Sequence, residues 1–294
     1  MRTLLMLGAS ALLMGASGCT TSRDVTPTPA SASTTTTSPN PLLAEWTGPY
    51  GGVPPFDRVR VEHFAPALEA AMVENLAEVE RIAQNPDAPT FENTIEALER
   101  TGRTLDRVQT VYGIWGSNLS TPDFQVIEQE MEPKLAAFYD RITQNEPLFR
   151  RIEAVYNSPA KASWTPEQQR LAWLYHTNFV RSGARLGAAQ KARLSEINQQ
   201  LAGLYTRFGQ NLLADETEQF IVLKSEEELA GLPQSVRDAA AAAAAAKKMP
   251  GAWVITNTRS SIDPFLTYSD RRDLREKAWR MFVNRGDNGD KNDN

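Results

Sequence analysis

Residues 188–214 read AAQKARLSEINQQLAGLYTRFGQNLLA, a stretch whose large apolar residues recur every three or four positions. These residues are Leu194, Ile197, Leu201, Leu204, Phe208 and Leu212. Because an α-helix turns once in about 3.6 residues, this spacing gathers them in one stripe along a helix. Helices pack on a core through such stripes, so the stretch predicts a long amphipathic helix with one buried face.

The same periodicity fills the chain before this stretch. Apolar stripes predict helices over residues 62–84, 91–115, 124–142 and 166–179. The last of these opens with Thr165-Pro166-Glu167-Gln168, which joins a capping box to a proline at the first helical position. Together these stretches predict a mainly α fold with a helical core.

The periodicity changes in the last third of the chain. Two short β-prone runs, Phe220–Leu223 and Trp253–Thr256, enclose a capping box at Ser225–Glu228 and an alanine-rich helix. We therefore expect a small β element near residues 218–268, followed by a last helix over 270–284.

The final ten residues, 285–294, read RGDNGDKNDN and predict a turn. Their acidic and amide side chains suggest calcium, but they do not match the EF-hand loop, which needs a glycine and a late glutamate at fixed positions. We expect a solvated turn that does not pack against the rest of the chain and holds no metal.

Residues 1–19 have the pattern of a lipoprotein-type signal peptide. Arg2 precedes an apolar run from Leu4 to Met14, which is too short to span a bilayer. Small residues follow as far as Cys19, the sole cysteine, and resemble the lipobox of bacterial lipoproteins. We expect lipid attachment at Cys19. The alternative is an ordinary secretory signal in which Cys19 has no role.

Residues 20–45 are rich in threonine, serine and proline. Such a segment cannot bury enough apolar surface to offset its chain entropy, so we expect a disordered tether. The tether would hold the folded part, residues 46–294, away from a membrane. Since Thr20 rather than an aspartate follows Cys19, we expect a lipoprotein anchored in the outer membrane and facing the periplasm.

Composition and motifs argue against several classes of function. A net charge of −5 argues against nucleic-acid partners, because phosphate contacts need a basic surface. The sequence contains no Gly-x-Ser-x-Gly elbow for a serine nucleophile and no Gly-rich phosphate loop that ends in Lys-Ser or Lys-Thr.

Zinc hydrolysis through H-E-x-x-H is also excluded within this chain. The motif needs two histidines one helical turn apart, with a glutamate between them that activates water. The only histidines are His63 and His176, and neither begins the motif. We expect both to be structural residues, and no catalytic or metal-ligating residue is predicted.

Several short stretches carry a family pattern. They are Asn40–Leu43, Gly51–Phe56, Val61–Ala67, Pro89–Glu99, Asp263–Asp270, Arg272–Glu276 and Arg285–Asn294. In their order and spacing they resemble the peptidyl-dipeptidase branch of the thimet oligopeptidase family of zinc metallopeptidases. The most specific stretch is Pro89-Thr90-Phe91-Glu92-Asn93-Thr94. The resemblance covers residues 40–294, nearly all of the chain expected to fold.

The resemblance implies a helical fold of two halves that face each other across a deep channel. In the family, zinc lies on the channel floor, and short unfolded peptides enter and lose C-terminal dipeptides. This chain would supply the N-terminal half, truncated before the catalytic region, and the full-length protein would be a monomer. We therefore expect no zinc and no activity in this chain alone. The alternative is a non-enzymatic helical lipoprotein that acts as a binding or scaffold module.

Overall fold

The structure is a computed structural model that describes residues 40–294. The expected signal peptide, Cys19 and most of the expected tether lie outside these residues. The chain divides into two compact units, one ending at Gly203 and one beginning at Leu204. The boundary falls inside a single long helix, α7 (Ala188–Glu218). Each unit is a fold with its own core, and the mainly α prediction is confirmed.

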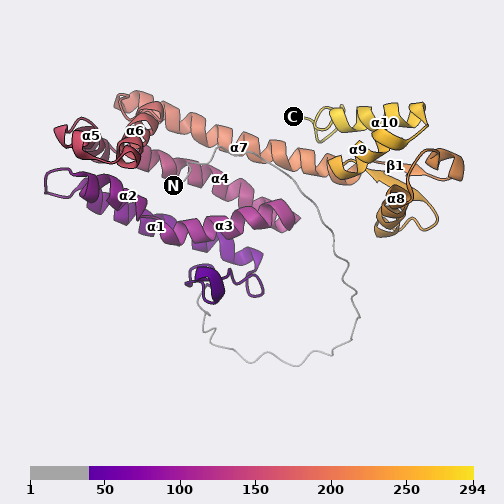
Figure 1. The fold of residues 1–294 in the computed structure, drawn as a ribbon, viewed down its shortest axis with the longest axis horizontal. Coiled ribbons are helices and arrows are strands. Elements are labelled where there is room, and N and C mark those ends of the chain that lie inside the picture. The colour runs from indigo at the N-terminus through magenta and orange to yellow at the C-terminus, as the bar shows by residue number, and fades with distance from the viewer. Residues whose placement is uncertain (1–39) are drawn as a thin grey trace. The chain divides into compact units, whose positions relative to one another are not determined.

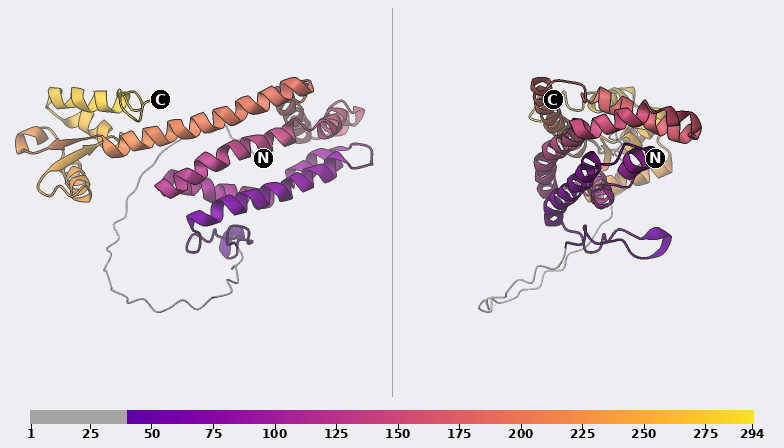
Figure 2. Two further views of the ribbon diagram at one scale, coloured as in Figure 1. Left: turned by 180° about the vertical axis from the view of Figure 1, so that it is seen from behind. Right: turned by 90° about the vertical axis from the view of Figure 1, so that its left-hand side faces the viewer.

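The first unit is a set of packed helices (Figure 1, Figure 2). In chain order they are α1 (Phe64–Ala83), α2 (Ala97–Glu99), α3 (Arg103–Asn118), α4 (Pro122–Thr143), α5 (Glu146–Tyr156), α6 (Pro166–Arg181) and the first part of α7. Helix α1 contacts α3, α4 and α5, and α6 packs on α5. The expected helices near 62–84, 124–142 and 166–179 are therefore confirmed.

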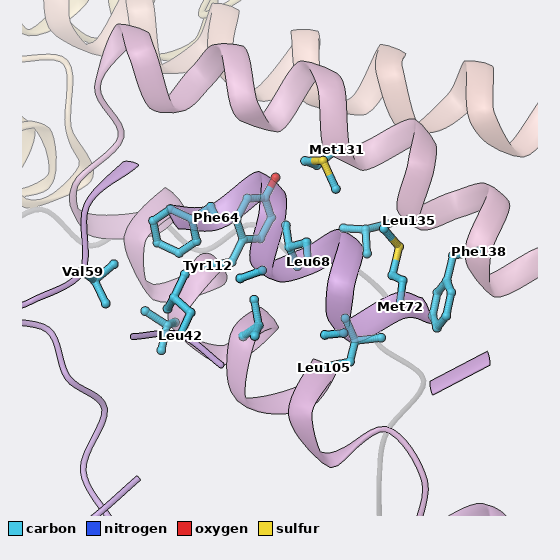
Figure 3. Close-up of a cluster of buried hydrophobic side chains, with 14 of the residues drawn as sticks. Leu42, Val59, Phe64, Leu68, Met72, Leu105, Tyr112, Met131, Leu135 and Phe138 are labelled. Atoms are coloured by element: carbon cyan, nitrogen blue, oxygen red, sulfur yellow. The ribbon is translucent and has the colours of Figure 1, made fainter. Parts of the chain in front are cut away.

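The main core of this unit lies between α1, α3 and α4. Figure 3 shows Phe64 and Leu68 of α1 beside Tyr112 of α3 and Met131 of α4. The ring of Phe64 is fully buried and meets that of Tyr112 edge-on, with 5.8 Å between ring centroids. Leu42 belongs to the same cluster and is 1% exposed. The packed chain thus begins before the boundary expected at residue 46.

The helix expected over 91–115 is two helical segments, which corrects that prediction. A turn of π-helix over Phe91–Glu96 runs into α2, and α3 begins only at Arg103. Gly102 separates them with φ at +71°, in the left-handed region that glycine adopts most readily. Its N–H donates to Glu78 Oε2 of α1 at 2.7 Å rather than to a carbonyl of the preceding turn. The apolar stripe continues across this break, which is why periodicity alone did not reveal it.

Two further helices were absent from the sequence-based prediction. Helix α5 is capped by Asn145, whose side chain accepts a hydrogen bond from the N–H of Leu148 at 2.9 Å. Helix α9 (Arg259–Tyr268) contains Pro264, a residue that argues against helix in a sequence-based reading. Both helices bury apolar residues, so packing against the rest of their unit accounts for them where a local sequence pattern does not.

The second unit combines a two-stranded antiparallel sheet with helices. Strand β1 (Phe220–Leu223) pairs with β2 (Trp253–Thr256), Phe220 lying opposite Thr256 and Leu223 opposite Trp253. Helix α8 (Gln234–Ala246) packs on β2, and α9 contacts α10 (Arg272–Val283). The sheet, the helix within its connection and the capping box at Ser225 are as expected.

Helix α7 has the predicted start but buries only part of the predicted stripe. Leu204 is 49% exposed, Tyr205 68% and Phe208 49%, and Asp215 is the one fully buried residue of the helix. Within residues 40–294 the expected buried face is formed only in part: Leu201, Leu204 and Phe208 of the predicted stripe are exposed, whereas Leu194, Ile197 and Leu212 are half-buried. Among residues 40–294, no helix is long and apolar enough to cross a membrane.

Candidate functional site

The last ten residues fold against the end of α7, which corrects the expectation of a turn that does not pack. The fixed point is the carboxylate of Asp215, which is fully buried. Its Oδ2 accepts hydrogen bonds from the N–H of Gly286 and from Asn288 Nδ2, each at 2.7 Å. Its Oδ1 accepts one from Asn292 Nδ2 at 2.9 Å. The buried carboxylate of Asp215 thus binds the loop through both of its oxygens.

The geometry of the loop depends on the residue type at three of its positions. Gly286 has φ at +75°, and a Cβ there would lie 2.6 Å from the side chain of Asn294. Asn288 and Asn292 supply amide donors, which an aspartate could not do. Gly286, Asn288 and Asn292 therefore have structural roles in this unit.

Ion pairs tie the rim of the loop to the last turn of α7. Arg285 pairs with Glu216, and Lys291 pairs with Glu218 at 2.8 Å. Three acidic residues in the last turn of a helix are unfavourable beside its dipole unless partners compensate them. That clustering is the signal in the sequence that could have identified Asp215, which the sequence-based prediction missed.

A cavity of about 250 Å³ lies beside the anchored loop. Glu218 and Gln219 line it where α7 ends, Phe220 and Ile221 line it from β1, and Lys277 and Met281 line it from α10. Glu218 is held by Lys291 and Asn292, and these contacts keep its pKa below the usual range. One lining residue, Glu218, is therefore bound to the loop that Asp215 anchors.

Both histidines make contacts within the first unit. His63 Nδ1 accepts a hydrogen bond from the N–H of Arg60 at 3.0 Å and so completes a capping box before α1. His176 stacks on Tyr156, with 4.1 Å between ring centroids. Its Nε2 lies 3.3 Å from the Arg185 guanidinium, which itself pairs with Glu153. Burial, followed by the charge of Arg185, lowers the pKa of His176.

These contacts do not fit a zinc site. His63 and His176 each have other partners, and no group of three or more His, Cys, Asp or Glu side chains gathers within residues 40–294. Zinc requires at least three such ligands in the sites where it acts. No step of metal-assisted hydrolysis is therefore assigned to these residues, and the expectation that the chain binds no zinc stays a prediction.

Comparison with known proteins finds peptidases among the relatives of this chain. No family model matches it. It is 33% identical over 254 residues to dipeptidyl carboxypeptidase of Escherichia coli K12, and 32% identical over 256 residues to the same-named protein of Salmonella typhimurium LT2. It is 28% identical over 260 residues to oligopeptidase A of E. coli K12. The chain is a homologue of the thimet oligopeptidase family of peptidases.

Each match covers most of this chain but only a little over a third of the relative. The match to the E. coli dipeptidyl carboxypeptidase takes in 86% of this chain but 37% of the relative. The match to oligopeptidase A takes in 87% of this chain and 37% of that relative. The chain therefore spans a little over a third of the length of the peptidases that it matches. The resemblance to the thimet oligopeptidase family is confirmed, and the family's activity is a separate question.

Proposed function

We propose that this chain is a non-catalytic part of a zinc metallopeptidase of the thimet oligopeptidase family. The whole enzyme would be a monomeric peptidyl-dipeptidase that releases dipeptides from the C-termini of short, unfolded peptides. The similarity to dipeptidyl carboxypeptidase over nearly the whole described chain carries this proposal. Its identity to that relative is 33%, against 28% to oligopeptidase A, which favours the dipeptidase branch.

Two stretches of the family pattern support the proposal by having clear structural roles. In Pro89–Thr94, Thr90 and Asn93 cap the following helix reciprocally. Buried Arg151 then donates to Asn93 Oδ1 at 2.9 Å and to the Asp87 carbonyl, fixing the loop before the helix. In 285–294, the loop is fixed by Asp215 in the same way. Both stretches therefore have structural roles in the described part of the chain.

The contribution of this chain would be binding and shape rather than chemistry. The zinc ligands and the glutamate base of H-E-x-x-H are absent from its sequence. The helices described here would form one wall of the channel and so limit the length and folded state of the peptides admitted. We also propose a lipid at Cys19, which would place the enzyme on the periplasmic side of the outer membrane.

A fusion experiment tests this function. The remaining length of the E. coli dipeptidyl carboxypeptidase would be joined after Asn294 and assayed on an N-terminally blocked tetrapeptide. We expect the fusion to release the C-terminal dipeptide and to lose this activity with a chelator. The 294-residue chain alone should be inactive and contain no stoichiometric zinc by elemental analysis. Chelator-sensitive cleavage by the chain alone would contradict the proposal, and so would a soluble, folded fusion without activity.

A further inference from the structure

The loop that Asp215 anchors contains the pair Asn288-Gly289, and no other asparagine of the sequence precedes a glycine. In such a pair the backbone nitrogen of the glycine can attack the side-chain amide carbon of the asparagine, since glycine has no side chain to hinder the approach. The asparagine then loses ammonia and becomes an aspartate or an isoaspartate. Gly289 has φ at +75°, so the turn itself favours glycine at this position. The reactive pair is therefore part of the geometry of the loop.

Both reacting groups are held by carboxylates in the folded chain. The N–H of Gly289, whose nitrogen is the nucleophile once it loses its proton, donates to Asp293 Oδ1 at 3.0 Å and to Oδ2 at 2.9 Å. The amide of Asn288, which carries the leaving group, donates from Nδ2 to Asp215 Oδ2 at 2.7 Å. A bond to a charged acceptor is stronger than one to a neutral acceptor, so it holds the Gly289 proton and fixes the Asn288 side chain. The attack therefore requires that the loop open first.

The product of this reaction is incompatible with the anchored loop. Gly289 is exposed and Asn288 is half-buried, so water reaches the pair, whereas Asp215 is fully buried. Deamidation sets a second carboxylate where an amide donor now lies, 2.7 Å from Asp215 Oδ2. Two carboxylates at this distance repel each other, and neither has a proton to donate when ionised. A deamidated loop therefore cannot return to its place around Asp215.

We propose that Asn288-Gly289 is a deamidation site which Asp215 and Asp293 protect, and that its reaction makes an opening of the loop permanent. In the open loop, the Gly289 amide nitrogen loses its proton to solvent and forms a bond to Cγ of Asn288. The Cγ–Nδ2 bond breaks, and Nδ2 leaves as ammonia after taking a proton from water. Water then adds to either carbonyl of the cyclic imide and opens the ring.

The overall reaction of Asn288 consumes a water molecule and releases an ammonia molecule, without oxidation or reduction. Ring opening at one carbonyl gives aspartate, and at the other it gives isoaspartate, in which the main chain runs through Cγ. The site lies in the second unit and involves none of the chemistry of peptide cleavage. This inference therefore goes beyond the proposed function and does not depend on it.

Peptide mapping of the full 294-residue chain measures the reaction at this residue. Trypsin cuts after Arg285 and Lys291, and in the peptide between them Asn288 is the sole amide side chain. Mass spectrometry therefore assigns any conversion in this peptide to Asn288. The reference is a synthetic peptide of residues 284–294, incubated in the same mildly alkaline buffer and digested in the same way. We expect the folded chain to react at least about tenfold more slowly than this peptide, because only the open loop reacts.

Substitutions in the loop test the protecting carboxylates. Asp293→Ala removes the acceptor of the Gly289 N–H and should accelerate deamidation about tenfold. Asp287→Ala is the matched control: within the described chain Asp287 is exposed, and its carboxylate bonds to neither reacting residue. Asp215→Ala should bring the rate close to that of the peptide. Asp293 is exposed, so its replacement tests the protection even if Asp215→Ala unfolds the second unit.

Amide hydrogen exchange at Gly286 tests whether the opening is permanent. The N–H of Gly286 donates to Asp215 Oδ2 in the anchored loop, so its exchange reports on detachment. We expect exchange to accelerate about tenfold in the deamidated chain and in Asn288→Asp, which copies one of the products. Asn288→Ala removes the same donor without adding a charge, so its effect should be smaller.

Two sets of results would overturn the inference. Protection by the loop is refuted if the folded chain deamidates at Asn288 as quickly as the peptide, or if Asp293→Ala reacts no faster than Asp287→Ala. Permanent opening is refuted if the deamidated chain exchanges at Gly286 as slowly as the parent, or if Asn288→Asp exchanges no faster than Asn288→Ala. Activity of the fusion enzyme enters none of these comparisons, so the proposed function stands or falls separately.

Discussion

Replacing Asp215 should detach the C-terminal loop and destabilise the second unit. Asp215→Ala leaves three donors without their acceptor: the N–H of Gly286 and the amides of Asn288 and Asn292. Gly286 and Asn292 are buried, whereas Asn288 is half-buried and can turn to water. A buried donor without a partner costs about 1–3 kcal/mol, and hydrogen bonds to a charged group are the stronger ones. We therefore expect a loss of about 3–5 kcal/mol in the free energy of unfolding.

The loss is limited by the ease with which the loop detaches. If the loop swings into water, its donors are solvated there, and the global loss falls below this range while the loop itself unfolds locally. Urea denaturation measures the first effect, and amide hydrogen exchange at Gly286 measures the second. Asp215→Asn keeps the shape and one carbonyl oxygen, so its loss should be smaller than that of Asp215→Ala.

Lys291→Ala is the control for this experiment. It removes an exposed ion pair at the rim of the same loop, and such pairs contribute little. The role given to Asp215 would be refuted if Asp215→Ala changed stability by no more than this control and left exchange at Gly286 unchanged.

Three further predictions follow from the other features. Because burial and Arg185 lower the pKa of His176 below its ordinary value, the unfolded chain takes up a proton more readily than the folded one. Stability should therefore be fullest above pH ~6.5 and decline below it, and urea midpoints across this range should show a weaker decline in His176→Gln. Cys19→Ser should release the protein from the membrane fraction of its host, and a parent protein that is already fully soluble would contradict lipidation. The exposed face of α7 should make the chain self-associate; changing Leu204, Tyr205 and Phe208 together to glutamine should reduce the mass seen by light scattering, and an unchanged mass would place the contact elsewhere.

Local signals in the sequence were sufficient for most of the elements. The capping box at Thr165 forms as expected, with hydrogen bonds of 3.0 and 3.2 Å between Thr165 and Gln168. The strands at 220–223 and 253–256 and the alanine-rich helix between them have their predicted places. These features depend on neighbours within a turn or a strand, so residue order alone specifies them.

The break at Gly102 and the burial of Asp215 depended on residues far away in the chain. Glu78 captures the N–H of Gly102 across 24 positions, and Asn292 reaches Asp215 across 77. Neither partner can be inferred from periodicity, because a hydrogen bond between distant segments leaves no repeating pattern in the sequence. The family resemblance included the loop at 285–294, yet only the tertiary structure revealed that it packs around Asp215.

The sequence by itself determined that this protein is mainly helical, that it carries no H-E-x-x-H motif, and that it resembles the thimet oligopeptidase family. Periodicity, caps and motif spacing are local properties that can be recognised in the sequence without a structure. Only the tertiary structure decided which stripes are buried: the stripe of α4 packs into a core, whereas that of α7 is exposed at Leu201, Leu204 and Phe208. The physical reason is that a stripe fixes which face of a helix is apolar, while burial depends on whether another element meets that face.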